Sequence, residues 1–141
     1  MSSFAFENLE GRQLFSGGYT INSLVGDWGG SVTVPSLQYT APTEIAIFKY
    51  NKNTIDVEGL YNEDGYIDIY LKGSVKSNGQ FSYSGTLYDD GVRNETIAIK
   101  GRVTNNSLYF TEYDTFTAVV QGGIGTYDYI DIFNLTPAAP I

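Results

Sequence analysis

Two carboxylates on one side of a predicted strand are the residues of this chain best placed to do chemistry. From residue 108 to 118, apolar and polar side chains alternate, which is the signature of a half-buried β-strand. Glu112 and Asp114 share the side of Leu108, Phe110, Phe116 and Ala118. On that face a carboxylate either is desolvated, with a raised pKa, or lies at the wet mouth of a cavity.

The register of this strand decides between two interpretations. A β-bulge near Glu112 would turn both acids to solvent, and bulges are common in a strand longer than its neighbours. A regular register would place Glu112 in the interior as the main polar contact of a cavity. Tyr83 and Trp28 complete the candidate binding residues: Tyr83 lies on the inward side of a predicted strand, and Trp28 is either a ligand contact or a core anchor.

The composition removes several kinds of chemistry. The chain has 141 residues and contains no His and no Cys, so it lacks imidazole catalysis, thiolate chemistry, disulfides and the usual zinc ligands. Asn62, Asp64 and Asp68 form an incomplete calcium loop without its final bidentate Glu. We therefore expect no metal site, no cofactor and no catalytic residue that the sequence alone can name.

The charge limits the partners. A formal net charge of -8 repels nucleic acid and anionic lipid surfaces, so no nucleic-acid partner is expected. No apolar run is long enough to span a bilayer as a helix, and membrane insertion is not expected. The sequence makes no prediction of the oligomeric state.

Eight strands separated by Asn, Asp and Gly turns account for the chain from Gly26 onward. Four successive strands contain an apolar-x-apolar-x-Gly pattern, in which the glycine lies on the inward side and permits a sharp bend or close approach of a neighbouring backbone. The four glycines are Gly59, Gly73, Gly85 and Gly101. The expected strands are Trp28 to Val34, Glu44 to Tyr50, Thr54 to Leu60, Tyr66 to Val75, Gln80 to Tyr88, Thr96 to Val103, Ser107 to Ala118 and Tyr127 to Leu135.

The short connections predict an all-β, antiparallel up-and-down meander of about eight strands that closes into a barrel. A β-sandwich or jelly roll is the alternative, with residues 35–43 or the glycine-rich segment after Val120 as the crossing connection. The predicted organisation is a lead-in over residues 1–25, one barrel domain over 26–136 and a tail over 137–141.

The start of the first strand, Gly26-Asp27-Trp28, resembles the Gly-x-Trp signature of the lipocalin and wider calycin barrels. That resemblance implies an eight-stranded barrel in which the Trp closes one end. In the family a basic residue of the last strand packs on this Trp, whereas no Lys or Arg follows Arg102 here. The terminal helix of true lipocalins also has no counterpart.

A second resemblance lies at the N-terminus. Phe6 to Ser16, FENLEGRQLFS, resembles the Leu-Glu-Pro-Arg-x-Leu-Leu signature of exported or surface proteins of planctomycete bacteria; Gly11 and Phe15 depart from it. It implies an extracellular or cell-surface location. The alternative is an amphipathic turn that packs Phe6, Leu9 and Leu14 on the domain.

Taken together, these features predict an exported, non-enzymatic barrel that binds a small, largely apolar ligand or acts as a surface adhesion module. An enzyme of calycin type, a cyclase or isomerase that uses one interior carboxylate, is the first alternative. A purely structural envelope protein is the second.

Overall fold

The computed structural model describes residues 18–60, 68–88 and 93–138, and the predictions that involve residues 1–17 and 61–67 lie outside this part of the chain. Two single-turn 3-10 helices, η1 (Ile21–Ser23) and η2 (Pro35–Leu37), accompany the strands. The strands are β1 (Gly26–Val34), β2 (Tyr39–Asn51), β3 (Thr54–Glu58), β4 (Asp68–Val75), β5 (Gln80–Tyr88), β6 (Arg93–Val103), β7 (Leu108–Val120) and β8 (Gly123–Pro137).

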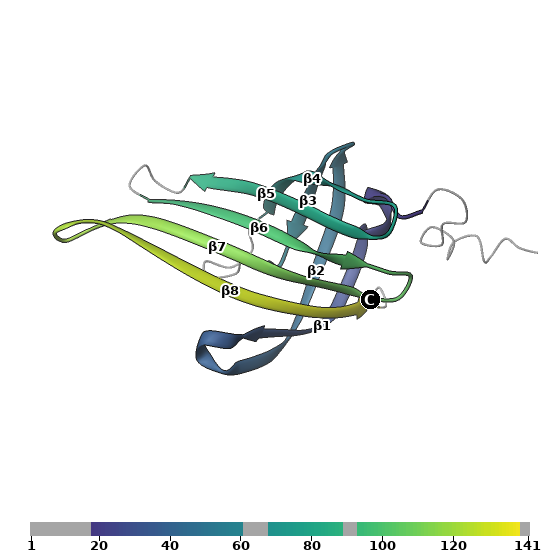
Figure 1. Cartoon of the computed structure of the whole chain (residues 1–141), viewed down its shortest axis with the longest axis horizontal. Helices are drawn as coiled ribbons and strands as arrows, with labels where there is room; N and C mark the ends of the chain where they lie inside the picture. Colours follow the sequence, from purple (N-terminus) through teal and green to yellow (C-terminus); the bar gives the residue numbers. More distant parts are fainter. Residues whose placement is uncertain (1–17, 61–67, 89–92, 139–141) are drawn as a thin grey trace, which may run out of the picture.

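The strands form a closed antiparallel barrel in sequence order, β1 to β8, as Figure 1 shows. Each strand pairs with the next, and β8 returns to pair with β1 from Trp28 opposite Pro137 to Thr33 opposite Ile132. Closure satisfies the backbone hydrogen-bonding groups that an open sheet would leave at its edges. The predicted meander barrel is therefore confirmed, and the sandwich alternative is wrong.

Both segments considered as crossing connections are tight hairpin turns. Residues 35–43 comprise the η2 turn, which ends on Gln38 with a left-handed φ of 52°, followed at once by β2. The glycine-rich segment is a short turn in which Gly122 has a φ of 95°, so that β7 and β8 are longer than expected. Gly122 tolerates its positive φ because it has no Cβ, whereas in the η2 turn a non-glycine residue, Gln38, adopts the left-handed conformation.

All four inward glycines allow close approach between strands: a Cβ on Gly59, which has a φ of 94°, would lie 2.7 Å from the Glu44 carbonyl oxygen, and the other three glycines lie within strands. A Cβ on Gly73 would overlap the carbonyl oxygen of Ser82, and one on Gly101 would overlap that of Tyr109. On Gly85 it would lie 2.5 Å from the carbonyl oxygen of Tyr70. None of the three has a left-handed φ, so the glycines are needed because the neighbouring backbone occupies the space of a side chain.

Aromatic and branched side chains fill the interior at one end of the barrel. Phe110 stacks on Phe133 with ring centroids 4.6 Å apart, and Phe81 meets Phe110 edge-on at 6.2 Å. Trp28 is completely buried, and its indole N–H donates to the Leu24 carbonyl at 2.9 Å. The lead-in contributes to this core, since Leu24 is itself fully buried.

The hairpins differ in length at the opposite end. β7 and β8 pair along their whole length, and Figure 1 shows their hairpin extending past β5 and β6, while the β1–β2 hairpin diverges below it. The pairing of β1 with β8 ends at Ile132, the residue that follows Asp131 in the sequence, so Asp131 has no partner on β1. The sheet is therefore split beside Asp131.

Candidate ligand-binding site

Strand β7 keeps a regular register along its length. Its residues pair one to one with β6 and with β8, without a shift. The predicted β-bulge near Glu112 is therefore wrong, because each residue of β7 that pairs with β6 or β8 lies opposite one residue of that strand. Glu112 and Asp114 lie on the inner side, with Leu108 and Phe110.

The register brings side chains from four strands into one row across the inner face. Glu112 lies opposite Ile99 on β6 and opposite Asp131 on β8, and Ile99 lies opposite Tyr83 on β5. We call Tyr83, Ile99, Glu112 and Asp131 the Glu112 row. Adjacent strands are about 4.8 Å apart, so neighbours in the row are in contact range.

A second row lies one step toward the split end, where Asp114 pairs with Ile97 on β6 and with Tyr129 on β8. Glu95 follows on β6, opposite Phe116. Four carboxyl groups, those of Glu95, Glu112, Asp114 and Asp131, therefore share this part of the interior.

Glu112 is the most deeply buried of the four, with 2% of its surface exposed. Burial raises the pKa of its carboxyl group well above the ordinary value, and the charges of Asp131 and Asp114, the hydrogen bond to Asp131 and the charge of Glu95 raise it further. The pKa of Asp131 is also raised, mainly by burial, although the hydrogen bond from Glu112 opposes that shift. The raised pKa favours the neutral carboxylic acid of Glu112, whose O–H group can donate a hydrogen bond to Asp131.

Two polar atoms at this site are buried and have no hydrogen-bond partner among the residues that the structure describes. They are the hydroxyl oxygen of Tyr83 and the Oδ1 atom of Asp114. Tyr83 is 1% exposed, and burial raises its pKa to about 12, so its hydroxyl group stays protonated. Buried polar groups almost always have partners, which makes two such atoms in adjacent rows a feature that requires explanation.

The site has contact with solvent on one side. Asp114 and Asp131 are partly exposed, whereas Glu112 and Glu95 are buried. Asp131 is also adjacent to Ile132, the last residue of β8 that pairs with β1. The carboxyl groups therefore run from the split in the sheet toward the core.

Of the predicted contacts, Tyr83, Glu112 and Asp114 come together, but Trp28 does not join them. Its partner on β8 is Pro137, six residues along the strand from Asp131, beyond the stacked phenylalanines. Its hydrogen bond to Leu24 and its full burial are those of a core anchor.

Sequence reasoning missed Glu95 and Asp131. Strand six was expected to begin at Thr96, which left Glu95 outside it, but β6 begins at Arg93. Asp131 lies on the same side of the strand as Phe133 and Leu135, which are buried. This alternation in the sequence could have indicated that Asp131 faces the interior. Its pairing with Glu112 follows only from the register of β7 with β8.

The arrangement can accept hydrogen bonds, hold a cation and exchange a proton between Glu112 and Asp131. Within the described residues, no group of three or more acidic side chains has a geometry that could hold a metal ion. The polar atoms are accompanied by apolar walls from Ile97 and Ile99.

Comparisons with protein-family models, curated proteins and solved structures find no match to this chain. Across residues 18–60, 68–88 and 93–138, no helix is long and apolar enough to cross a membrane.

Proposed function

We propose that this chain is a non-enzymatic β-barrel that binds a small molecule with an apolar body and a cationic, hydrogen-bond-donating group. The molecule would occupy the split end of the barrel, beside the Glu112 row. Barrels of about eight strands are wide enough to hold one small ligand.

The observation that carries this proposal is the pair of buried polar atoms without partners, the Tyr83 hydroxyl and Asp114 Oδ1. Leaving such an atom unsatisfied costs about 1–3 kcal/mol, so a protein retains it where something else provides the partner. A ligand that donates to Asp114 and bonds to Tyr83 would satisfy both.

The charges determine the class of ligand. Burial and the neighbouring acids raise the pKa of Glu112, which favours its neutral form, while the hydrogen bond from Glu112 favours the carboxylate of Asp131. An ammonium group would compensate the negative charge at Asp131 and Asp114, whereas an anionic ligand would be repelled. Ile97 and Ile99, both buried, would contact the apolar body.

The test compares three probes of one shape: 2-phenylethylamine, 2-phenylethanol and phenylacetate. The amine should raise the melting temperature and bind measurably by calorimetry, the alcohol should bind more weakly, and the acid should not bind. Asp114→Asn should weaken amine binding by about 10-fold to 100-fold, the usual effect of a charged hydrogen bond. Tyr83→Phe should weaken binding without lowering stability.

Asp128→Asn is the matched control. Asp128 is exposed one strand away and accepts a hydrogen bond from Thr115 at 3.0 Å, so this variant removes the same charge outside the site. Equal loss of affinity in Asp114→Asn and Asp128→Asn, or no binding of the amine, would contradict the proposal.

The hydrogen bond between Glu112 and Asp131 favours a second candidate, an enzyme that moves a proton with an interior carboxylate pair. Incubating the protein in D₂O with a ketone of similar shape, phenylacetone, and following exchange of its α-hydrogens by NMR separates the two functions, because only a C–H bond next to a carbonyl group is acidic enough for a carboxylate to exchange. Binding alone predicts no exchange above the rate in buffer.

An exported or cell-surface location remains part of the proposal. It rests on the resemblance of residues 6–16 to a planctomycete signature, and these residues lie outside the described part of the chain. Fusing residues 1–17 to a reporter in a planctomycete host tests it, with Arg12→Ala as the matched variant.

A further inference from the structure

Acidic residues are unevenly distributed over the outer surface of the barrel. On β1 to β3, an outer pocket of about 290 Å³ is lined by Asp27, Glu44 and Glu58. On β5, β6 and β7 the outward positions, which alternate with the buried ones, carry no Asp or Glu in the described strands.

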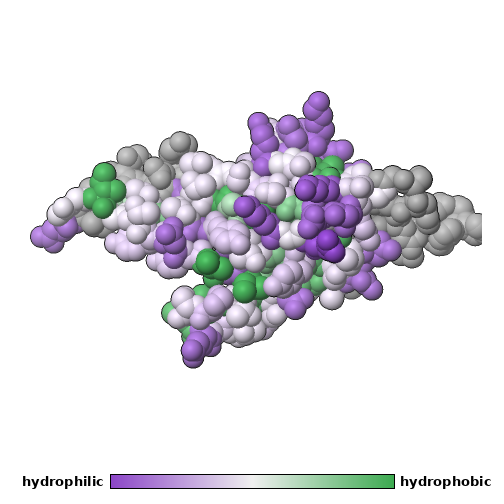
Figure 2. Space-filling view, viewed as in Figure 1, coloured by the Kyte–Doolittle hydropathy of each residue, from purple (hydrophilic) through white to green (hydrophobic). Residues whose placement is uncertain are grey.

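Cations occupy this second face. A groove of about 500 Å³ is lined by Lys76, Lys100 and Arg102, which are three of the eight Lys and Arg residues of the chain. Among the described residues none of the three has a carboxylate partner. Figure 2 shows strongly hydrophilic residues gathered over these strands. Positive charge without a partner in an acidic protein indicates an anionic ligand.

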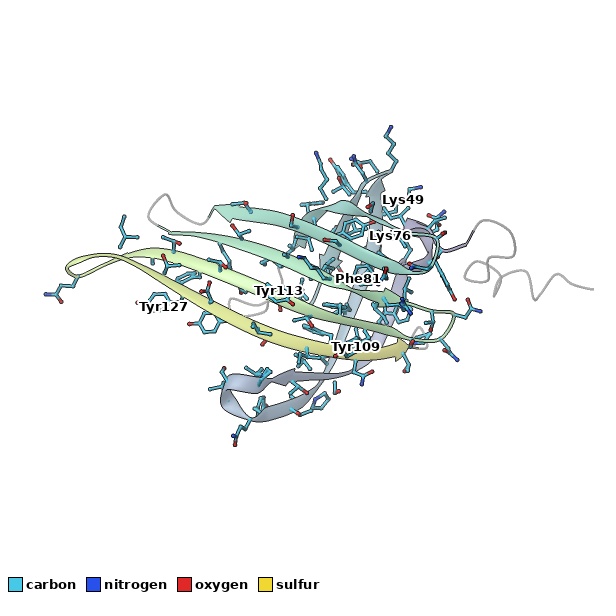
Figure 3. All side chains as sticks on the ribbon, viewed as in Figure 1. Lys49, Lys76, Phe81, Tyr109, Tyr113 and Tyr127 are labelled. Atoms are coloured by element: carbon cyan, nitrogen blue, oxygen red, sulfur yellow. The ribbon has the colours of Figure 1, made fainter. Side chains whose placement is uncertain are left out.

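Hydroxyl, amide and aromatic groups complete the groove. Ser74, Ser82 and Lys100 form one cross-strand row, and Gln80, Arg102 and Tyr109 form the next. Tyr109 is 49% exposed, and Lys100 lies 6.0 Å from the centre of the Tyr113 ring. Figure 3 shows Lys76, Tyr109 and Tyr113 on the viewed side of the barrel.

We propose that this groove binds an acidic oligosaccharide, with carboxylates or sulfates on Lys76, Lys100 and Arg102, sugar hydroxyls on Ser74, Ser82 and Gln80, and a sugar ring on the face of Tyr109. The site is independent of the interior one. It would make the outer face a surface for attachment to acidic glycans.

The groove fits such a saccharide better than other anions. A uronate chain carries one negative charge per residue, as a nucleic acid does, but each of its sugars also presents several free hydroxyl groups to neutral hydrogen-bonding side chains. A membrane surface would require apolar side chains to insert, but Phe81 in the groove wall is only 5% exposed. The serines and the glutamine, which are neutral, match hydroxyl groups.

The test measures binding of tetragalacturonate to the full chain by calorimetry in 20 mM and 300 mM NaCl. We expect binding at low salt that weakens at least 5-fold at high salt, and no binding of the neutral maltotetraose. Lys100→Gln with Arg102→Gln should weaken binding at least 10-fold. Tyr109→Ala should weaken it about 5-fold.

Each variant has a matched control outside the groove. Lys49→Gln with Lys52→Gln makes the same change in net charge at exposed positions of β2 and its turn, and Tyr39→Ala removes an equally exposed ring. Both should bind within 2-fold of wild type. If circular dichroism shows that the Lys100 and Arg102 double variant does not fold, the two single variants replace it. The comparison of Tyr109→Ala with Tyr39→Ala then provides a second test.

Two results with tetragalacturonate would overturn the proposal: no binding at low salt, or an equal loss of affinity in the two double variants. Two results with other anions would also overturn it: a 12-residue oligothymidylate that binds more tightly than tetragalacturonate, or binding of the protein to phosphatidylglycerol vesicles. Self-association detected by light scattering and abolished in Lys100→Gln with Arg102→Gln would overturn it as well, since the groove would then hold the acidic surface of a second copy.

Discussion

At the scale of single residues, Glu112 is a carboxyl group whose buried position lowers the stability of the fold. Its side chain is 2% exposed and surrounded by the acidic groups of Asp131, Asp114 and Glu95. A carboxyl group in such surroundings remains in the fold only as the neutral acid, and the hydrogen bond to Asp131 gives that form a partner. The same residue thus opposes folding at neutral pH and organises the polar interior.

Replacing Glu112 by Gln should remove a pH dependence of stability. The pKa of Glu112 is higher in the folded protein than its ordinary value of 4.5. The contribution of Glu112 to the stability of the fold is therefore complete below about that pH and is lost as the pH rises toward the folded pKa. The loss is at most about 1.4 kcal/mol per pH unit. Gln keeps a donor for Asp131 and does not titrate.

Urea unfolding at pH 4.0 and pH 7.5 measures this effect. We expect the two proteins to be nearly equal at pH 4.0 and Glu112→Gln to be more stable by roughly 1–3 kcal/mol at pH 7.5. A difference in unfolding free energy that is the same at both pH values would show that Glu112 does not titrate abnormally.

At the scale of strands, the inward glycines set how closely neighbouring backbones approach. Gly73 and Gly101 lie on β4 and β6, each facing the carbonyl oxygen of a residue on the adjacent strand. The strands can bend around the aromatic core only where no side chain intervenes. The repeated glycine pattern is therefore a consequence of barrel curvature.

Gly73→Ala should destabilise the barrel by about 3 kcal/mol, or roughly 10 °C in melting temperature, because the new Cβ would overlap the backbone of Ser82. Gly29→Ala is the control, since its Cβ would lie 3.6 Å from Ala138 in ordinary contact. Thermal unfolding of both variants checks the prediction, and an equal change in the two would refute it.

At the scale of the whole molecule, closure depends on residues far apart in the sequence. β1 and β8 are joined by six residue pairs, and Ala138 adds a backbone hydrogen bond to Asp27 at 2.9 Å. The lead-in is attached to the same barrel, because the Tyr19 N–H donates to the Ser77 carbonyl at 2.9 Å. The folding unit therefore extends a few residues before β1.

A chain that starts at Gly18 should melt within about 3 °C of the full chain, since all eight strands and Leu24 are retained. A chain that starts at Val25 should melt roughly 10 °C lower, because it loses buried Leu24 and the acceptor of the Trp28 indole. Differential scanning calorimetry of both shortened chains and the full chain measures the three melting temperatures. A large fall in the first would show that residues 1–17 support the fold.

The sequence by itself determined where the eight strands lie, although not their exact ends, and which side chains of a strand share a face. Both follow from a local alternation with a period of two, so Tyr83 could be assigned to the inner face, whereas Glu112 and Asp114 were assigned there only if their strand had no bulge. Short turns then required antiparallel pairing, and the inward glycines favoured a barrel.

The tertiary structure decided which residues meet. The pairing of Glu112 with Asp131, the row that joins them to Tyr83, and the gathering of Lys76, Lys100 and Arg102 in one groove all depend on the register between strands. Register is set by hairpin geometry and by closure of β8 on β1, and the alternation within one strand carries no information about either.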